Sequence, residues 1–294
     1  MMMDSTQAAT GRILVVGALG QIGTELVHEL NQRIGTDRVL ASDLRPPAHY
    51  QGNFVALDVT DRQQLDEVVA THHVQEIYHL AAILSARGES NPTQAWDINL
   101  AGLLNVLEVA RMRGVKRIFW PSSIAVFGPQ SPKQVTPQDT VTDPNTVYGI
   151  SKLAGERWCE YYHQKYGLDI RSIRYPGLIG YQSLPGGGTT DYAVEIFHAA
   201  LKREVYTCFL RPGTKLPMMF MDDAIRATLK LMEAPSHRIR VRSSYNLQGL
   251  SFTPEEIVRE IQKHVPGFSC KYEPDFRQKI ADSWPASLDD TSAR

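Results

Sequence analysis

A tyrosine and a lysine four residues apart, Tyr148 and Lys152, stand at the start of a predicted helix. Residues with this spacing share one face of a helix, so the phenol and the ammonium would lie together. A phenol is a poor base at neutral pH, and a neighbouring cation favours its phenolate form. The pair is therefore a candidate for taking a proton from a substrate hydroxyl, although the same spacing also occurs in solvated pairs on helix surfaces.

Two serines, Ser122 and Ser123, follow a predicted strand, RIFW, that begins at Arg117. Ligands bind at the carboxyl ends of the strands in open parallel sheets. A serine hydroxyl at that edge can hydrogen-bond a reacting oxygen as hydride leaves the adjoining carbon. Alone, the two serines would be ordinary loop residues at a strand end; with Tyr148 downstream they complete a candidate set of Ser, Tyr and Lys.

Three glycines, Gly17, Gly20 and Gly23, connect the predicted strand ILVV to a predicted helix. In a dinucleotide site the first permits a tight turn, the second lets the backbone approach a pyrophosphate, and the third lets the helix pack on the strand. The phosphates then face the N–H groups and the positive end of the helix dipole. Such a triplet also arises by chance between strands and helices, so its context decides.

The context is supplied by Asp43, which closes the second predicted strand twenty residues after Gly23. A carboxylate there can accept hydrogen bonds from the adenosine ribose hydroxyls. It would repel a 2′-phosphate, which predicts NAD rather than NADP as the cofactor. Two alternatives stay open: Asp43 as an ordinary turn residue, and Arg45 as a cation that favours NADP.

The elements that must position these residues alternate regularly. Short apolar strands are predicted at ILVV, VLAS, FVAL, EIYHL, RIFW and DIRSIRY, and helices at about 21–32, 62–71, 93–113 and 148–165. This alternation predicts an α/β fold with a Rossmann-type, doubly wound parallel sheet. After Tyr175 the rhythm breaks into Pro- and Gly-rich loops. We therefore predict an NAD-binding domain over residues 1–175, to which 218–248 return, and a smaller α+β substrate-binding domain over 176–217 and 249–294.

Composition narrows the class of protein. The formal net charge of −1 gives no general reason to bind nucleic acid or an anionic membrane. Three scattered cysteines with no CxxC spacing predict reduced thiols and no metal site. The first ten residues lack the apolar stretch of a signal peptide, and no later run is long enough for a membrane span. We expect a cytoplasmic enzyme acting on a small molecule.

A set of motifs in order resembles the extended short-chain dehydrogenase family, which includes UDP-galactose 4-epimerase. The motifs are GALGQIG, Asp43, Asp58-Val59, LAAIL, DINLAG, PSSIAVFG and YGISKLAGE. The resemblance implies that Ser123, five residues before Gly128, is catalytic together with Tyr148 and Lys152. It also implies a homodimer formed through the helices near 99–113 and 148–165, an isologous arrangement.

The same resemblance assigns a cofactor surface. Asp58 and Val59 would flank the adenine, and the stretch from Leu80 would pass under the cofactor. Asn99 matches a helix-bending asparagine, with a plain helix-surface position as the alternative. The full set of expected NAD-binding residues is Gly17, Gly20, Gln21, Ile22, Gly23, Asp43, Leu44, Asp58, Val59, Leu80, Ala81, Ala82, Asn99, Tyr148, Lys152, Tyr175 and Leu178.

The segment GGGTTDYA resembles the short-chain type of L-threonine 3-dehydrogenase, a branch of that family. Its glycines and hydroxyls at a helix start suit a carboxylate, and Asp191 could pair an ammonium group; the alternative is a glycine loop with Thr190 as the N-cap. The expected substrate residues are Ser85, Ser123, Tyr148, Gly187, Thr189, Thr190, Asp191 and Trp284. Threonine dehydrogenases continue for a short stretch beyond Arg294, so we expect a shortened C-terminal edge here.

The expected activity is NAD-dependent oxidation of the L-threonine 3-hydroxyl to 2-amino-3-ketobutyrate, a step of threonine catabolism. A nucleotide-sugar 4-epimerase or dehydratase with the same Ser, Tyr and Lys is the first alternative; it would need a larger cleft and would retain its NAD. A non-catalytic NAD-binding regulatory protein is the second. The complete catalytic set argues against the latter, since a protein that only binds NAD has no need of all three groups.

Overall fold

The computed structural model of the chain describes residues 11–47 and 49–294. The prediction about a signal peptide falls on residues 1–10, outside the described part. No helix among the described residues is long and apolar enough to cross a membrane.

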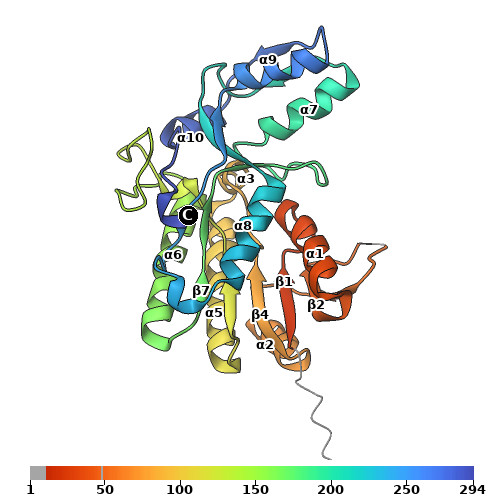
Figure 1. Ribbon diagram of the computed structural model, residues 1–294, viewed down its shortest axis with the longest axis vertical. Coiled ribbons are helices and arrows are strands. Elements are labelled where there is room, and N and C mark those ends of the chain that lie inside the picture. The colour runs from red at the N-terminus through yellow and green to blue at the C-terminus, as the bar shows by residue number, and fades with distance from the viewer. Residues whose placement is uncertain (1–10, 48) are drawn as a thin grey trace, which may run out of the picture.

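A six-stranded parallel sheet forms the centre of the molecule (Figure 1). Its strands, in the order β3-β2-β1-β4-β5-β7, are β3 (Asn53–Ala56), β2 (Val39–Asp43), β1 (Arg12–Val16), β4 (Val74–His79), β5 (Arg117–Phe119) and β7 (Ile170–Arg171). The direction of strand progression reverses between β1 and β4, where open α/β sheets bind their ligands. The predicted Rossmann-type fold is confirmed.

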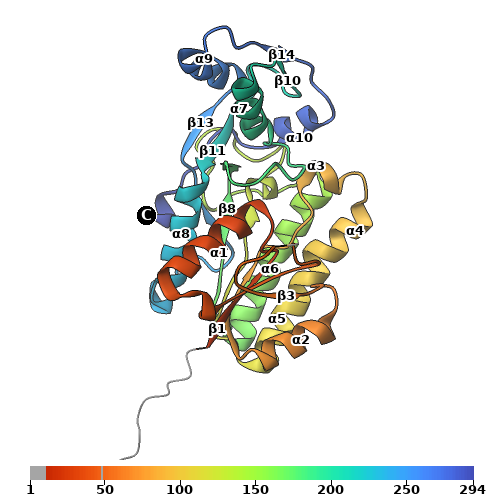
Figure 2. The same cartoon turned by 90° about the vertical axis from the view of Figure 1, so that its right-hand side faces the viewer.

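Helices cover both faces of this sheet (Figure 2). On one face, α1 (Gln21–Ile34) and α8 (Met221–Glu233) share a core with β1 and β2. On the other, α2 (Arg62–Thr71), α5 (Gly102–Arg113) and α6 (Val147–Tyr166) pack over β4 and β5. Strands buried on both faces explain the nearly continuous apolar runs in the sequence.

The predicted helix over 93–113 is interrupted. It consists of α4 (Pro92–Trp96), a π-helical turn (Asp97–Ala101) and α5. Asn99 lies in that turn, accepts from the Ile83 N–H at 2.7 Å, and donates to the Ile83 carbonyl at 3.0 Å. It is 2% exposed, so the helix-surface alternative for Asn99 is wrong. The π turn aims this amide at the chain that follows β4.

The strand predicted over 169–175 is also divided. β7 pairs with β5, whereas β8 (Ile173–Tyr175) pairs with β6 (Ser122–Ser123) and β12 (Tyr245–Asn246) in a separate small sheet. The division at Ser172 lets two neighbouring strands leave the main sheet together. As a result Ser123 and Tyr175 lie side by side in register at the edge where ligands bind.

The C-terminal half builds a second core. It contains the strand groups β13-β11-β9 and β10-β14 together with α7, α9 and α10. The bounds are β9 (Gly177–Ile179), α7 (Tyr192–Lys202), β10 (Tyr206–Cys208), β11 (Leu216–Phe220), β13 (Leu250–Phe252), α9 (Pro254–His264), β14 (Cys270–Tyr272) and α10 (Arg277–Ser283). Residues 124–127, just after β6, belong to the same core. We propose the predicted two-part division on this basis.

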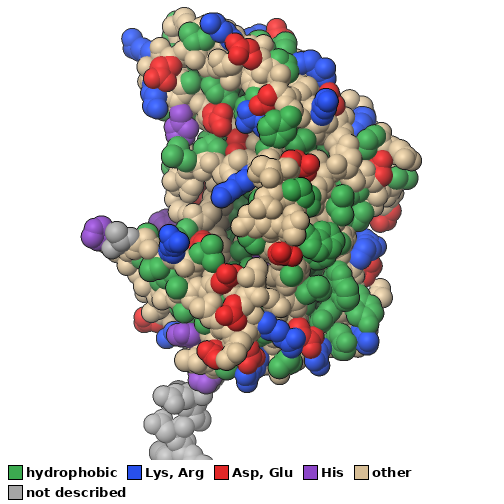
Figure 3. Space-filling model, turned by 180° about the vertical axis from the view of Figure 1, so that it is seen from behind, with side chains coloured by type: hydrophobic (Ala, Val, Ile, Leu, Met, Phe, Trp, Pro, Cys, Tyr) green, Lys and Arg blue, Asp and Glu red, His purple; other side chains and the backbone are tan. Residues whose placement is uncertain are grey.

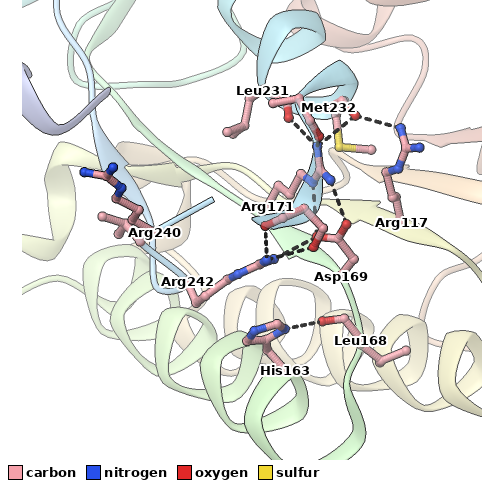
Figure 4. A network of polar contacts seen from close by, with 12 residues as sticks. Arg117, His163, Leu168, Asp169, Arg171, Leu231, Met232, Arg240 and Arg242 are labelled. Atoms are coloured by element: carbon pink, nitrogen blue, oxygen red, sulfur yellow. Dashed lines mark hydrogen bonds and ion pairs between the residues drawn. The ribbon is translucent and has the colours of Figure 1, made fainter. Parts of the chain in front are cut away.

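A buried arginine anchors α8 to the sheet (Figure 4). Arg171 donates to the carbonyls of Leu231, Met232 and Ala234 at the end of α8, and it pairs with Asp169 at 2.7 Å. Asp169 also pairs with Arg242 at 2.7 Å. The guanidinium thus satisfies carbonyls that the helix itself leaves unpaired, and its charge is compensated, as a buried charge requires.

Candidate active site

The three loop glycines differ in what surrounds them. Gly17 has a φ of +82°, and a Cβ on it would lie 2.6 Å from the Ala81 nitrogen. A Cβ on Gly23 would lie 2.3 Å from the Gly17 carbonyl oxygen, whereas one on Gly20 would meet only that oxygen, at 3.5 Å. Gly17 and Gly23 are therefore required by packing, while Gly20 faces open space in front of α1. This is the cradle that a pyrophosphate would fill.

The helix that follows leaves its first turn uncapped by a side chain, with Gly20 as its N-cap. The free N–H groups and the helix dipole suit a phosphate. Asp43 stands beside this loop: its carboxylate accepts from the N–H groups of Leu19 at 3.1 Å and Leu44 at 2.8 Å. The residues present thus fit a dinucleotide, and Asp43 joins the end of β2 to the glycine loop.

The expected adenine residues follow β3. The Asp58 carboxylate accepts from both the N–H and the hydroxyl of Thr60, and Val59 is buried against Gly102. Asp58 is exposed at the same edge of the sheet as Asp43. Leu80 and Ala81 follow β4 directly, and Ala81 adjoins Gly17. The sheet topology therefore aligns all these positions along one edge.

The catalytic set assembles where β6 meets the start of α6. The Thr146 side chain caps α6 by accepting from the Gly149 N–H at 3.1 Å. This fixes the first turn, so that Tyr148 and Lys152 share a face, with the Lys152 Nζ 5.5 Å from the Tyr148 ring centroid. Ser123 and Tyr148 line the same cavity. The three predicted catalytic side chains are thus brought together.

Burial shifts both ionisable groups toward their neutral forms. It raises the pKa of Tyr148 to about 12, although the nearby Ser123 side chain works in the opposite direction. It lowers the pKa of Lys152 to about 7. The Lys152 Nζ donates to the Pro121 carbonyl at 2.6 Å and lies 4.6 Å from the Trp120 ring centroid. The chain alone therefore holds the phenol protonated, and a bound nicotinamide would add the positive charge that favours the phenolate.

One cavity unites the catalytic and substrate positions. Among its lining residues are Ser123, Tyr148, Lys152 and the predicted substrate residues Ser85, Thr189, Thr190, Asp191 and Trp284. The expected cofactor residues Gln21, Ile22, Leu80, Ala82, Tyr175 and Leu178 line it as well. Segments from both halves of the chain thus converge on the Tyr148 hydroxyl. In the part of the chain that the structure describes, no cluster of His, Cys, Asp and Glu could hold a metal.

The glycine-rich loop is arranged differently from expectation. The Asp191 carboxylate accepts from the N–H groups of Gly187 at 2.8 Å and Gly188 at 2.7 Å, and the Thr189 N–H donates to Ser85 Oγ at 3.2 Å. The loop was expected to offer its N–H groups to a substrate carboxylate, and this is wrong for Gly187, Gly188 and Thr189, because the Asp191 and Ser85 side chains already accept from them. Asp191, and not Thr190, is the N-cap of α7. Burial raises the pKa of Asp191.

Sequence reasoning distinguished Ser123 from Ser122 only through the family resemblance, and it did not find the hydrogen-bond network around Ser122. Ser122 donates to Glu156 at 2.6 Å, and Arg174 binds the same carboxylate with both nitrogens at 2.8 Å. Glu156 lies one helical turn after Lys152, and this spacing could have placed it on the same face of the helix. Leu84, Pro176 and Met221 also line the cavity, but as apolar loop or helix-start residues they gave no signal.

Residues 13–247 match the NAD dependent epimerase/dehydratase family. A GalE-like L-threonine dehydrogenase from Cupriavidus necator in its holo form is 55% identical, with a TM-score of 0.94 over 96% of this chain and 92% of that one. A monomeric L-threonine 3-dehydrogenase from a metagenome is 51% identical, with a TM-score of 0.94 over 96% and 91%. An uncharacterised epimerase/dehydratase from Staphylococcus haemolyticus is 50% identical over 96% of this chain and 90% of its own length. The chain belongs to the NAD dependent epimerase/dehydratase family, as an NAD-dependent oxidoreductase or epimerase of the extended short-chain dehydrogenase type.

Proposed function

We propose that the protein is an L-threonine 3-dehydrogenase, acting in threonine catabolism. The observation on which this rests most is the convergence of the glycine-rich loop, through Thr189 and Asp191, on the cavity that contains Tyr148. The likeness to solved threonine dehydrogenases at more than half identity supports it.

In this proposal Tyr148 takes the proton of the substrate 3-hydroxyl, and Ser123 donates a hydrogen bond to the oxygen as it becomes a carbonyl. Lys152 supports the phenolate and holds the nicotinamide ribose. NAD, when bound, would supply the acceptor for the hydride of C3. The organic product is 2-amino-3-ketobutyrate. The proton of the 3-hydroxyl thus goes to Tyr148, and the hydride of C3 would leave as part of NADH.

Because the loop N–H groups are occupied, hydroxyls are the groups left to bind the substrate zwitterion. Ser85 Oγ and Thr189 Oγ1 share a hydrogen bond of 2.9 Å in the cavity wall, so one of the two hydroxyls keeps its proton for a substrate carboxylate. Asp191 has one oxygen committed to the loop, and its other oxygen is available for an ammonium group. The predicted substrate residues thus stay the same, but side-chain groups of Ser85, Thr189 and Asp191 replace the backbone N–H groups as the ones that bind the substrate.

The experiment is an NADH-formation screen of L-threonine, L-serine, L-allo-threonine and a UDP-sugar. We expect L-threonine to be oxidised best, because a site built to hydrogen-bond a zwitterion rejects analogues that leave its groups unpaired. A UDP-sugar converted without net NADH, by protein that retains NAD through purification, would assign the epimerase alternative. The family name alone favours that alternative.

Thr189→Ala is the matched test of substrate binding. It removes a hydroxyl that is 1% exposed and bonded to Ser85, so KM for L-threonine should rise about tenfold, the cost of one hydrogen bond to a charged group. NAD affinity should stay unchanged, because Thr189 lies outside the loop of Gly17, Gly20 and Gly23 that would hold the cofactor phosphates. Thr207→Ala, at an exposed position on β10, is the control. An unchanged KM in the Thr189 variant would refute the assignment.

We also propose a homodimer through α5 and α6. Large hydrophobic side chains gather on the lower right of the face seen in Figure 3. On these two helices the exposed ones include Met112, Ile150, Trp158, Tyr161 and Tyr166. Light scattering should give twice the chain mass, and Trp158→Glu should give monomers, whereas Leu201→Glu on α7 should not. One similar enzyme is described as monomeric. If light scattering shows that the wild-type protein is also monomeric, the proposed dimer through α5 and α6 is wrong.

A further inference from the structure

Trp284 separates two cavities. The indole side chain follows α10 directly and is 6% exposed. It lines the reactive cavity together with Tyr148 and Thr189, and it also lines a second cavity of about 540 Å³. That second cavity is bounded by Lys133, Pro212, Thr214 and Ala286 among others. Trp284 therefore forms part of the wall of both cavities, while it also belongs to the hydrophobic core of the C-terminal half.

A lysine holds the backbone of this wall. The Lys133 Nζ donates to the carbonyls of Ser283 at 2.6 Å, Gly128 at 3.1 Å and Trp284 at 3.4 Å. An ammonium has three protons, so these three acceptors use all of them. Two of the carbonyls stand at the end of α10, where a helix leaves them unpaired. The third belongs to the turn after the catalytic strand, and Figure 1 shows the Lys133 loop beside α10.

The C-terminal segment beyond Trp284 has separate attachments. Ala286 N–H donates to the Lys133 carbonyl at 2.8 Å, Thr136 N–H to Ser287 at 2.9 Å, and Asp289 N–H to Thr136 at 2.9 Å. These backbone bonds do not involve the lysine side chain. Removing the ammonium would therefore release the end of α10 and Trp284, while the neighbouring segment stays paired.

We propose that Lys133 is a positioning residue that fixes Trp284 as the wall of the reactive cavity and thereby sets substrate affinity. The proposal rests on the proposed function only for the identity of the substrate. With Lys133 in place, the indole closes the cavity against Thr189 and Tyr148. Without it, the indole can move toward the second cavity, and the substrate loses a packing surface. The chemical step at Ser123 and Tyr148 is not altered.

The test is Lys133→Met, which keeps the apolar stem and removes the donors. KM for L-threonine should rise about three- to tenfold, in the range of the net contribution of one typical hydrogen bond, with kcat nearly unchanged. Lys133→Arg keeps the charge and the donors and should restore most of the affinity. Lys215→Met is the matched control, because Lys215 lines the same second cavity and makes no hydrogen bond among those found in the described residues. A kcat loss with unchanged KM, or an equal effect of Lys215→Met, would overturn the proposal.

A fluorescence measurement needs no turnover. Trp120 is 1% exposed, whereas Trp96 and Trp158 are each 39% exposed. All four tryptophans contribute to the fluorescence of the wild type. The difference between the fluorescence of the wild type and that of Trp284→Phe gives the contribution of Trp284. Acrylamide should quench Trp284 more strongly in Lys133→Met than in the wild type, and the lysine substitution should change nothing in a Trp284→Phe background. Equal quenching of Trp284 in both proteins would refute the positioning role, even if L-threonine proved not to be the substrate.

The two residues should also act through one another. Trp284→Phe alone should raise KM for L-threonine, and adding Lys133→Met should raise it little further, because contacting residues are not additive. If the effects of Trp284→Phe and Lys133→Met on the KM were fully additive in free energy, Lys133 would not act through Trp284. An unchanged KM in Trp284→Phe would overturn the proposal by itself, whatever the stability of the lysine variant.

Discussion

Tyr148→Phe should lower kcat for L-threonine oxidation by about 100- to 10,000-fold, the usual contribution of a positioned proton-transfer group. The ring remains, so the packing of the cavity and the affinity for NAD should be nearly preserved. Only the hydroxyl is lost from the cavity that Tyr148 lines together with Ser123. Steady-state kinetics and a titration of NADH fluorescence measure the two effects separately.

Tyr161→Phe is the control for that variant. It removes a hydroxyl from the same helix, where it accepts a bond from Lys165 at the surface, and it keeps the ring used by the proposed dimer face. Activity should be unchanged. Near-wild-type turnover in Tyr148→Phe would exclude the phenol as the acid and base. A large loss of NAD affinity would instead mean that the phenol mainly holds the cofactor.

The features that could be predicted from the sequence depend on local chemistry. Gly17 and Gly23 admit no side chain because backbone atoms lie within 2.6 Å of where a Cβ would be, and glycine spacing reports this directly. Tyr148 and Lys152 share a helix face by periodicity alone. The parallel sheet then brings strand ends to one edge, so Ser123 and Asp43 could be assigned roles before the fold was described.

The features that could not be predicted depend on competition between local partners. Asp191 could bind a substrate ammonium or the loop N–H groups, and the structure has it accepting from Gly187 and Gly188. Side-chain carboxylates often satisfy their own backbone in this way, and spacing does not decide between the two. Asn99 likewise depended on whether the helix contained a π turn.

Contacts between residues far apart in the sequence could not be predicted for a different reason. Lys133 binds the carbonyls of Ser283 and Trp284, which are about half a chain length away. Any main-chain carbonyl accepts a hydrogen bond, so no residue type marks these acceptors. Glu156 and Arg174 form a buried pair only because β8 leaves the main sheet at Ser172. Such contacts follow from the packing of the whole chain.

Lys152→Met should lower kcat/KM for L-threonine at neutral pH by roughly 100-fold, in the range for acid and base catalysis. Among the residues that line the cavity, Lys152 carries the cation nearest to Tyr148, with its Nζ 5.5 Å from the centre of the Tyr148 ring. Without it the phenolate is less stable, so the pKa of Tyr148 in the complex with NAD should rise. The acidic limb of the pH profile should therefore move to higher pH, and the deficit relative to wild type should shrink as pH increases.

This variant should also differ from Tyr148→Phe in the cofactor. Lys152 is expected to hold the nicotinamide ribose, so its loss should weaken NAD binding, whereas loss of the phenol should not. Lys116→Met, at an exposed position before β5, is the control. A uniform loss of activity with an unmoved acidic limb would mean that Lys152 acts only by binding the cofactor. Burial lowers the pKa of Lys152 to about 7, so the affinity of the wild type for NAD should fall as the pH rises through neutrality and Lys152 loses its proton.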